Sequence, residues 1–374
     1  MAPQDWEDWL RLLATDGVGC GTARRLLAAF GPPGQVLAQP QDELARVAGA
    51  ALAQRLRQVP ANWEALRRQT AAWLAQPGHH LIALGEPAYP AALLATPDPP
   101  VLLHVVGEPA ALAAPRALAI VGSRHATPQG LANAQAFAAA LAQRGVAIVS
   151  GLAAGIDGAA HEGALQAGGI TVAVVGTGAD RVYPARHQAL ARRLVEAGGA
   201  IVSEYLLGTP PRASNFPRRN RLIAGLAHGT LVVEAALDSG SLITAELAAQ
   251  MGREVFAIPG SIHAPQSRGC HALIRQGAKL VETVEHIEEE LRAIWGQLQA
   301  VAAPQPAATP TSTSPAEEAD PVLRALGHDP LDFDTLQARC GWDTAALQAH
   351  LLALELDGVV ARLPGGRLQR VARA

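Results

Sequence analysis

Short apolar runs alternate with Gly-rich turns and helical stretches between Ala117 and Thr283. The runs lie at 117–121, 146–149, 170–175, 200–203, 230–233 and 254–258. A continuous apolar run bounded by glycine is typical of a strand buried in a parallel sheet. The Ala- and Leu-rich stretches between the runs are long enough for right-handed crossover helices. The pattern predicts a doubly wound α/β domain, with its ligand site outside the carboxyl ends of the strands.

Residues 1–76 predict a helical domain, with Trp9 among the residues of its first apolar face. A Gly-rich turn at 16–21 separates two helices, and Thr22 is expected to cap the helix over 23–30. Helix, Gly-x-Gly turn and helix resemble a helix-hairpin-helix, whose turn amides hold a DNA phosphate. Because the turn carries no basic residue, an ordinary αα-hairpin is the preferred interpretation.

The flanking segments predict an extension, a linker and a third domain. The proline-rich stretch 77–115 contains two short strand patterns and extends the α/β domain, which we place at 77–300. Residues 301–320 are rich in Pro, Ala, Ser and Thr and predict a flexible linker. Residues 321–374 show three helical patterns and a hairpin around Pro364-Gly365-Gly366, which predicts a winged helix. The second helix of this domain carries little positive charge. The sequence therefore predicts the fold of a DNA-binding winged helix but gives less support for DNA binding by it.

Composition limits the function. The formal charge is −3, so a protein that is basic all over is excluded and any nucleic-acid site must be local. Lys279 is the single lysine among 30 basic residues, and the arginines suit bidentate contact with phosphate. The 3 cysteines show no metal-type spacing, which fits a reducing compartment. Without a signal peptide or a membrane-length apolar run, we expect a soluble cytoplasmic protein that makes no membrane contact.

The first predicted strand ends at Gly122-Ser123-Arg124. Glycine allows a ligand to approach the backbone, the following amides can hold an anion, and Arg124 projects from the same turn. The G-x-G-x-x-G fingerprint of a dinucleotide site is missing here, so we expect no cofactor. A plain strand-to-helix turn is the alternative, and this motif alone is weak.

The clearest basic cluster is Asn215-Phe216-Pro217-Arg218-Arg219-Asn220-Arg221, just before a helical run at 222–227. Arginines near a helix N-terminus oppose the helix dipole and cost stability unless an anion offsets them. Phe216 beside them offers a stacking surface, and an aromatic ring with arginines is the usual way to hold single-stranded nucleic acid. We therefore expect Phe216, Arg218, Arg219, Asn220 and Arg221 to bind DNA.

Three further loops follow strands. Ser239, Gly240 and Ser241 open a helix and can hold a phosphate, and the loop 176–187 carries Arg186. In the loop 150–161, Asp157 is expected to cap the next helix, and His161 follows four residues later. Helix capping and helix packing explain these two residues.

Glu234 and Asp238 are the only carboxylates we consider for acid-base work. Neither has a nucleophile partner, so we expect no catalytic residue and no metal site.

Together these motifs resemble the DNA-processing protein A family (DprA, also called Smf). The ordered blocks include GSR, SGLAxGID, GTG-x-D-x-x-YP, NFP-x-RNR-x-IAGL, SGSLITA and LI-x-x-GA over 117–283. The resemblance implies an extended Rossmann-like core between a helical sterile-alpha-motif-like domain and a winged helix. It also implies homodimers that bind single-stranded DNA, protect incoming DNA and load the recombinase RecA during natural transformation. Members are not known as enzymes of DNA hydrolysis.

Carried onto this sequence, the family's DNA pocket includes Gly122, Ser123, Arg124, Phe216, Arg219, Asn220 and Arg221. Arg186 stands where many relatives have lysine, whereas Ala154 and His271 depart from the family pattern of arginine and asparagine. The family's dimers form through the late part of the Rossmann domain. We therefore expect Leu273 or Ile274 near a dimer axis, in a block that also predicts an edge strand.

An enzyme is the alternative. The same Rossmann variant resembles the lysine-decarboxylase-like or LOG family, nucleotide phosphoribohydrolases with a PGG-x-GT-x-x-E loop. This chain keeps Gly229-Thr230 and Glu234 but lacks the PGG entry, so hydrolysis is the minor interpretation. A plain nucleotide-binding scaffold stays open as a third class.

Overall fold

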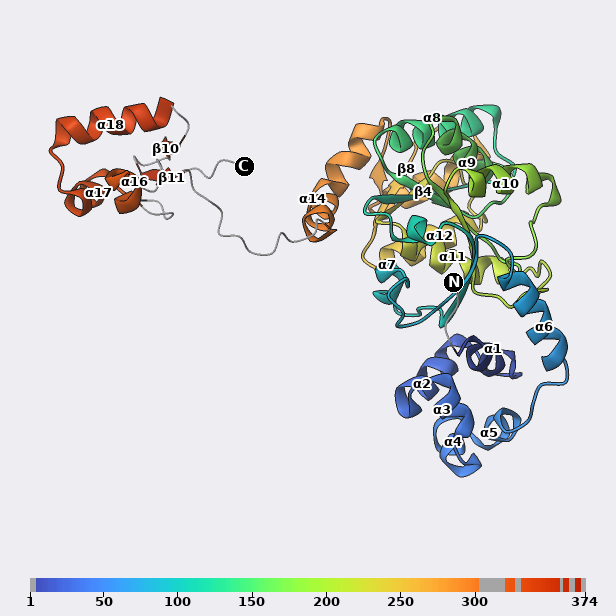
Figure 1. Ribbon diagram of the computed structural model, residues 1–374. Coiled ribbons are helices and arrows are strands. Elements are labelled where there is room, and N and C mark those ends of the chain that lie inside the picture. Colours follow the sequence, from blue (N-terminus) through green and yellow to red (C-terminus); the bar gives the residue numbers. More distant parts are fainter. Residues whose placement is uncertain (1–4, 303–319, 327–330, 357–358, 363–366, 371–374) are drawn as a thin grey trace. The chain divides into compact units, whose positions relative to one another are not determined.

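The computed structural model describes residues 5–302, 320–326, 331–356, 359–362 and 367–370. They belong to two compact units, Met1–Ala302 and Ala303–Ala374. In Figure 1 the first unit runs from blue to orange and the second is red. Most of the predicted linker, at 303–319, lies outside the described residues. The boundary near 76 stays a prediction, because the helices before it pack with the sheet in one unit.

The first unit is built on a nine-stranded sheet with the order β1-β2-β6-β5-β4-β3-β7-β8-β9. Strands β3 to β9 pair in parallel, which confirms the predicted doubly wound domain. Strands β1 and β2 add an antiparallel extension next to β6, as the proline-rich stretch predicts. The strands are β1 (His79–Ala83), β2 (Leu102–Gly107), β3 (Ala117–Val121), β4 (Ala147–Ser150), β5 (Thr171–Val174), β6 (Ala200–Ser203), β7 (Gly229–Val232), β8 (Glu254–Ala257) and β9 (Lys279–Leu280).

Helices cover both faces of this sheet (Figure 1). Leu118 and Ile120 of β3 pack towards one layer, and Ala119 and Val121 pack towards the other, which is why the strand reads as a continuous apolar run. The first layer holds α8 (Pro128–Gln143), α9 (Ile156–Gln166), α10 (Gln188–Glu196) and α14 (Val284–Ala302). The second holds α7 (Ala91–Leu94), α11 (Asn215–Leu226), α12 (Ser241–Gln250) and α13 (Arg268–Arg275).

The chain reverses its direction across the sheet at β3. Strands β4, β5 and β6 follow on one side of β3 with their helices in the first layer. The chain then crosses through α11 to β7 on the other side of β3, and β8 and β9 continue outwards from there. The carboxyl ends of β3 and β7 therefore diverge into helices on opposite faces, and this crevice is where such sheets bind ligands.

Six helices precede the sheet: α1 (Trp6–Ala14), α2 (Cys20–Phe30), α3 (Pro33–Ala38), α4 (Gln41–Ala48), α5 (Ala50–Leu56) and α6 (Trp63–Leu74). Leu26 and Trp73 pack with Leu81 and Leu102 of the sheet, so the tryptophan is a core residue. The expected cap at Thr22 is wrong. Gly19, with φ −92° and ψ 170°, is the N-cap, and its extended backbone lets α2 begin at Cys20.

The second unit contains α16 (Pro321–Leu326), α17 (Phe333–Cys340), α18 (Thr344–Leu356) and the antiparallel strands β10 (Val360–Arg362) and β11 (Leu368–Arg370). Leu336, Leu351 and Leu368 share one core, and the arrangement confirms the predicted winged helix. The expected hairpin turn at 364–366 lies outside the described residues. In the parts of both units that the structure describes, no helix has the length and apolarity that crossing a membrane requires.

Candidate nucleic-acid interface

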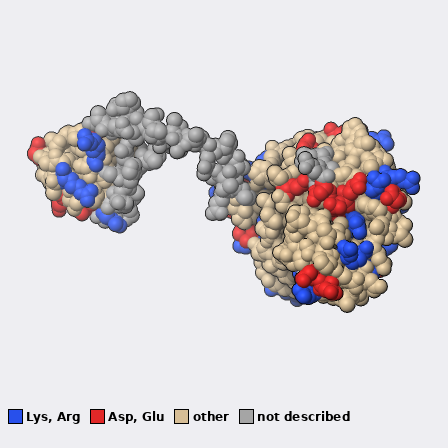
Figure 2. Space-filling model, turned by 60° about the horizontal axis from the view of Figure 1, so that its bottom comes forward, with Lys and Arg blue, Asp and Glu red and all other residues tan. Residues whose placement is uncertain are grey.

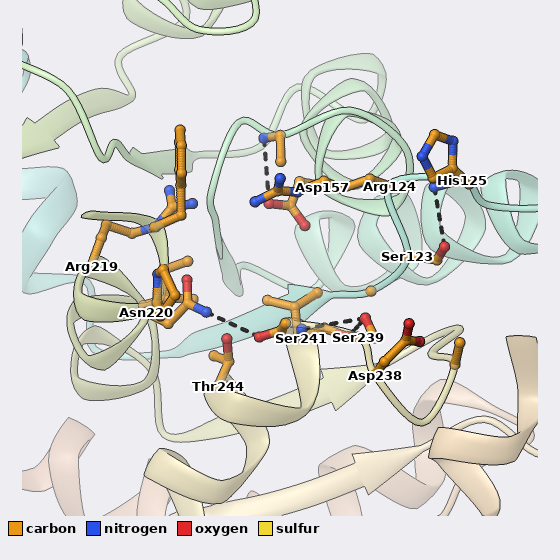
Figure 3. A pocket seen from close by; sticks show the side chains of 18 of the residues that line it. Ser123, Arg124, His125, Asp157, Arg219, Asn220, Asp238, Ser239, Ser241 and Thr244 are labelled. Carbon is orange, nitrogen blue, oxygen red and sulfur yellow. Dashed lines mark hydrogen bonds between the residues drawn. The ribbon is translucent and has the colours of Figure 1, made fainter. Parts of the chain in front are cut away.

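A cavity of about 690 Å³, the main cavity, opens at the carboxyl ends of β3 and β7. Figure 3 shows Arg124 and Ser123 on its upper side, Arg219 and Asn220 from α11 at the left, and Ser239 and Ser241 below. These residues come from the loop after β3, the start of α11 and the loop before α12. The volume lies within the range of ordinary small-ligand pockets, and the position is the one that the topology predicts for a ligand.

The turn after β3 is fixed by its neighbours. A Cβ atom on Gly122 would lie 2.6 Å from Ile156 Cγ1 and 2.8 Å from the Glu234 carbonyl oxygen, so only glycine fits. The next amide, of Ser123, donates to that carbonyl at 2.7 Å, and the Ser123 carbonyl accepts from the Ile156 amide at 3.2 Å. Arg124 follows as an exposed residue, so a rigid backbone presents its side chain to the cavity.

The exposed guanidinium of Arg124 lies over the ring of Phe216, 5.2 Å from its centroid. On the same ring, Tyr183 packs with centroids 5.5 Å apart at 37°. A cation over an aromatic face is attracted by the ring quadrupole. Tyr183 lines the cavity but is not among the residues predicted to bind DNA. An aromatic side chain in a loop after a strand of the sheet was the available signal.

The opposite wall is the N-terminus of α12. Its first turn contains no acidic residue, and the Ser239 and Ser241 hydroxyls lie 2.8 Å apart. Asn220 on α11 donates from Nδ2 to the Gly240 carbonyl at 3.2 Å, which ties this loop to α11. The Ser239 amide donates to the Ala236 carbonyl at 3.0 Å and the Ser241 amide to the Ser239 hydroxyl at 3.4 Å, so this wall offers an anion the two hydroxyls and the positive end of the helix dipole. Asp238 stands exposed at the edge of the same wall.

Helix α11 begins at Asn215, so the predicted basic cluster forms its first two turns instead of preceding it. Arg219 is only 3% exposed, and its Nη1 donates to the carbonyls of Gly151, at 2.8 Å, and Val174. Asp157 does not cap α9 as expected. Its buried Oδ2 accepts from the amides of Gly151 (3.1 Å) and Ala153 (3.4 Å), because the loop before the helix folds back over the carboxylate.

Arg219 and Asp157 form the floor of the main cavity. Burial lowers the pKa of Arg219 to about 10, against the raising influence of the Asp157 carboxylate. Burial likewise raises the pKa of Asp157, against the lowering influence of Arg219. At pH 7 a pKa of about 10 leaves Arg219 charged. The arginine therefore supplies positive potential from beneath the cavity, with its guanidinium already bonded to the backbone.

The other predicted basic residues point elsewhere. Arg221 is buried and pairs with Glu204 at 2.5 Å and Asp98 at 2.9 Å, away from the main cavity. Arg218 is exposed and lines a second cavity of about 300 Å³, and Arg186 lies exposed on the short 3-10 helix η2 (Ala185–His187). The residues that the main cavity does bring together are Gly122, Ser123, Arg124, Phe216, Arg219, Asn220, Ser239, Gly240 and Ser241.

Of the two candidate acid-base carboxylates, Asp238 is exposed, whereas Glu234 has structural partners, as has the buried His161. Glu234 accepts hydrogen bonds from the Thr127 amide, at 2.9 Å, and from its hydroxyl, and so holds the start of α8. His161 is fully buried with Nδ1 2.7 Å from the Thr171 hydroxyl, and burial lowers its pKa to about 3. Within the described residues, no cluster of His, Cys, Asp and Glu could hold a metal ion.

On the face that Figure 2 presents, acidic and basic side chains are interspersed. The lining of the main cavity is mixed as well, with Arg124 and Arg219 beside the carboxylates of Asp157 and Asp238. The cavity adds the N-terminus of α12 and an aromatic pair. Such a combination holds a phosphate and stacks an unpaired base.

Comparison with known proteins also indicates a protein that acts on DNA. Residues 80–292 match a family model described as DNA recombination-mediator protein A, and residues 304–366 match a DprA winged helix domain. Protein Smf of Escherichia coli K12 is 48% identical over 301 residues, which cover 80% of each chain. DNA processing protein DprA of Streptococcus pneumoniae R6 is 46% identical over 202 residues, which cover 54% of this chain and 71% of that protein.

Two solved structures are similar as well. The X-ray structure of Streptococcus pneumoniae DprA superposes with a TM-score of 0.66 and 35% identity, over 78% of this chain and 99% of that one. A Helicobacter pylori DprA structure, described as giving insight into a single-stranded DNA binding mode, has a TM-score of 0.52 and 30% identity. The match covers 57% of this chain and 96% of that one. With a match to the family model over residues 80–292 of 374 and a relative at 48% identity, the chain belongs to the DNA-processing protein A family of DNA recombination mediators.

Proposed function

We propose that this chain binds single-stranded DNA in the main cavity and acts there as a recombination mediator. The observation that carries the proposal is the Arg124 guanidinium over the Phe216 ring, 5.2 Å from its centroid, at the edge of a cavity with an anion-binding helix start. The single-stranded DNA binding described for the Helicobacter pylori relative supports it.

The two halves of the site suit the two halves of a nucleotide. A phosphate fits between Arg124 and the hydroxyls of Ser239 and Ser241 at the start of α12, above the charged floor of Arg219. A base fits against Phe216 and Tyr183, whose rings already lie together. Stacking on a side chain requires a base that is not paired in a duplex. We therefore expect single strands to bind more tightly than duplexes of the same length.

A gel-shift comparison of single- and double-stranded oligonucleotides of equal length tests this preference. Tighter binding of the single strand, weakened by added salt, is the expected result, because released counterions drive phosphate binding. Equal affinity for both forms would contradict the proposal.

The wider role is proposed from the family. We expect the chain to protect incoming single strands and to load RecA on them during natural transformation, in the cytoplasm and without hydrolysing DNA. Loading is measured as the rate at which RecA forms filaments on single strands that carry a single-strand-binding protein. No acceleration by this chain would contradict the RecA part and leave DNA binding untouched.

We further propose a symmetric homodimer through the late part of the first unit. Strand β9 is the outer strand of the sheet, and its Leu280 is 46% exposed. Leu273 is buried against the core, whereas Ile274 beside it is only partly buried. An uncovered edge with an apolar side chain favours pairing with a second copy. Two main cavities on one dimer would then engage one strand with added avidity.

Nucleotide hydrolysis stays the second candidate because Gly229-Thr230 and Glu234 of the LOG-like loop are present. Glu234, however, is held by both hydrogen-bond donors of Thr127. A general base has to reach the proton that it removes. We expect no free adenine after incubation with AMP, and adenine release that Glu234→Gln abolishes would establish the hydrolase instead.

A further inference from the structure

The second cavity, which we call the seam cavity, lies between the N-terminal helices and the sheet. Its volume is about 300 Å³, at the lower end of small-ligand pockets. One wall is the turn before α2, including Gly19 and Cys20, and another is the segment after β6, including Tyr205. The remaining wall carries Arg212 and Arg218. Neither the fold nor the main cavity explains why two arginines gather here.

The seam cavity adjoins the main cavity across one short segment. Pro211 and Ala213 line the main cavity, whereas Arg212 between them lines the seam cavity. Helix α11 is divided in the same way, with Phe216 on the main side and Arg218 on the seam side. A strand that leaves the main cavity over residues 211–213 therefore reaches the seam cavity directly.

The seam cavity has an unbalanced positive charge. Arg212 and Arg218 are exposed, and neither makes an ion pair with any residue that the structure describes. Glu204 is the one carboxylate in the described lining, and its Oε2 is taken by Arg221 at 2.5 Å and by the Cys20 thiol at 3.4 Å. Neither arginine is paired within the described residues, so an anion that lies between them would be attracted to both.

The start of α2 faces these arginines. Gly19 is its N-cap and offers no side-chain cap, and the first turn has no acidic residue. A Cβ atom on Gly19 would lie 3.9 Å from Arg218 Nη2, so the arginine lies beside this turn. The sequence of this turn lacks a basic residue, but the fold supplies one from α11. Helix-start amides and an arginine together bind a phosphate.

The other walls are apolar or aromatic. Val18 and Leu206 line the seam cavity, and Tyr205 donates from its hydroxyl to the Asn215 carbonyl at 3.1 Å, which fixes its ring. An aromatic ring with a satisfied hydroxyl can pack against a sugar or a base without losing a hydrogen bond. The cavity thus offers an anion site and an apolar face within the space of one small ligand.

We propose that the seam cavity is a second subsite for the same DNA strand, taking the phosphate and sugar of a nucleotide beside those in the main cavity. The phosphate lies between Arg212, Arg218 and the first amides of α2, and the neighbouring sugar or base lies on Tyr205. The proposal rests on the proposed function, because it needs a strand that already occupies the main cavity. It gives the N-terminal hairpin a direct part in DNA binding.

The test compares oligo-dT of about 4 and about 16 nucleotides, the range of site sizes per single-strand-binding module. Arg212→Ala in the full chain should weaken the binding of the long oligonucleotide several-fold. It should also flatten the dependence of log affinity on log salt concentration by about 0.7. Binding of the short oligonucleotide should be weakened less, because fewer of its positions on the chain occupy both cavities at once. Arg192→Ala removes an exposed arginine of α10 and serves as the control for net charge.

A second measurement does not depend on a substitution. A long oligonucleotide that carries 4-thiothymine, cross-linked by ultraviolet light, should label peptides with residues 18–20 or Tyr205 besides those of the main cavity. A tenfold excess of inorganic phosphate or dTMP should leave this labelling in place, because a connected strand binds with a high effective concentration.

Three results would overturn the subsite. Arg212→Ala could weaken the binding of both oligonucleotides equally, or could weaken binding only as much as Arg192→Ala does. Cross-links could be confined to the main cavity. Free dTMP could remove the labelling, which would make the cavity a mononucleotide site. Failure of either oligonucleotide to bind the wild-type chain would instead refute the proposed function itself, and this subsite with it.

Discussion

The guanidinium of Arg124 lies over the Phe216 ring, with 5.2 Å between its central carbon and the ring centroid. The two residues come from the turn after β3 and the first turn of α11. Each orients the other, since the ring holds the cation at the opening of the main cavity and Tyr183 packs on that ring as well. DNA binding should therefore be more sensitive to this pair than to any single phosphate contact.

Arg124→Ala is expected to weaken single-stranded DNA binding without unfolding the chain. The residue is exposed, and a hydrogen bond to a charged group contributes about 1.5–3 kcal/mol. The affinity should fall roughly ten- to a hundredfold, with the salt slope flattened by about 0.7. Fluorescence anisotropy at several salt concentrations measures both, with Arg192→Ala as the charge control. Wild-type affinity and slope would remove Arg124 from the site.

Arg219→Ala should behave differently, although the sequence places both arginines in one pocket. The variant removes buried hydrogen bonds to the Gly151 and Val174 carbonyls and leaves the Asp157 carboxylate without its nearby cation. Breaking such a buried arrangement costs about 3–5 kcal/mol of unfolding free energy. Urea unfolding checks this, and adding Asp157→Asn should restore part of the loss. A fully stable Arg219→Ala would contradict the account.

The strands and turns of the sheet could be predicted because their signals are local. Every apolar run between Ala117 and Ile258 overlaps a strand, and its Gly-rich end opens on a helix. The directions of Arg218, Arg219 and Arg221 could not. Consecutive residues of an α-helix point about 100° apart, so a cluster that reads as one patch in sequence is divided among different surroundings. Only the packed sheet and the N-terminal helices decide which arginine is buried.

Stability should fall in mild acid because His104, His161 and His228 are buried, and burial lowers the pKa of each ring. Burial lowers the pKa of His104 to about 4 and of His161 to about 3. Since the unfolded pKa is about 6.5, the unfolded chain binds protons first as the pH falls. Their contribution is complete above pH 6.5 and is lost towards pH 4, at about 1.4 kcal/mol per pH unit for each histidine. Urea unfolding at pH 7 and 5.5 measures this loss.

His104→Gln is the matched variant for that prediction. It should lose part of the histidine-dependent slope between pH 7 and 5.5, because His161 and His228 keep their contributions, whatever the stability of the variant at pH 7. An unchanged slope in His104→Gln would mean that the ring is protonated in the folded chain.

A chain that ends after Ala302 should keep its affinity for single-stranded DNA. The main and seam cavities lie wholly in the first compact unit, and the second unit has its own core. Anisotropy titrations of the shortened and full-length chains should agree within a few-fold. If the shortened chain melts normally and yet loses most of its affinity, the winged helix is a main DNA reader.

Ile274→Glu tests the proposed dimer. Ile274 is partly buried beside the edge strand, and a charge there should separate two copies at the cost of DNA affinity gained through avidity. Sedimentation should show a folded monomer, and Leu280→Glu on the exposed edge should act in the same way. Global unfolding of Ile274→Glu together with an intact dimer in Leu280→Glu would make Ile274 a core residue and exclude this interface.

The switch of direction at β3 also decides when the molecule can first hold DNA. The main cavity takes one wall from residues 121–125 and another from 236–244, and α12 closes it only after β7 has paired with β3. At about 5–20 residues per second, a ribosome needs roughly 6 to 22 s to pass from one wall to the other. A nascent chain therefore carries its arginines without a site during that interval, and capture of a strand awaits release of the finished sheet.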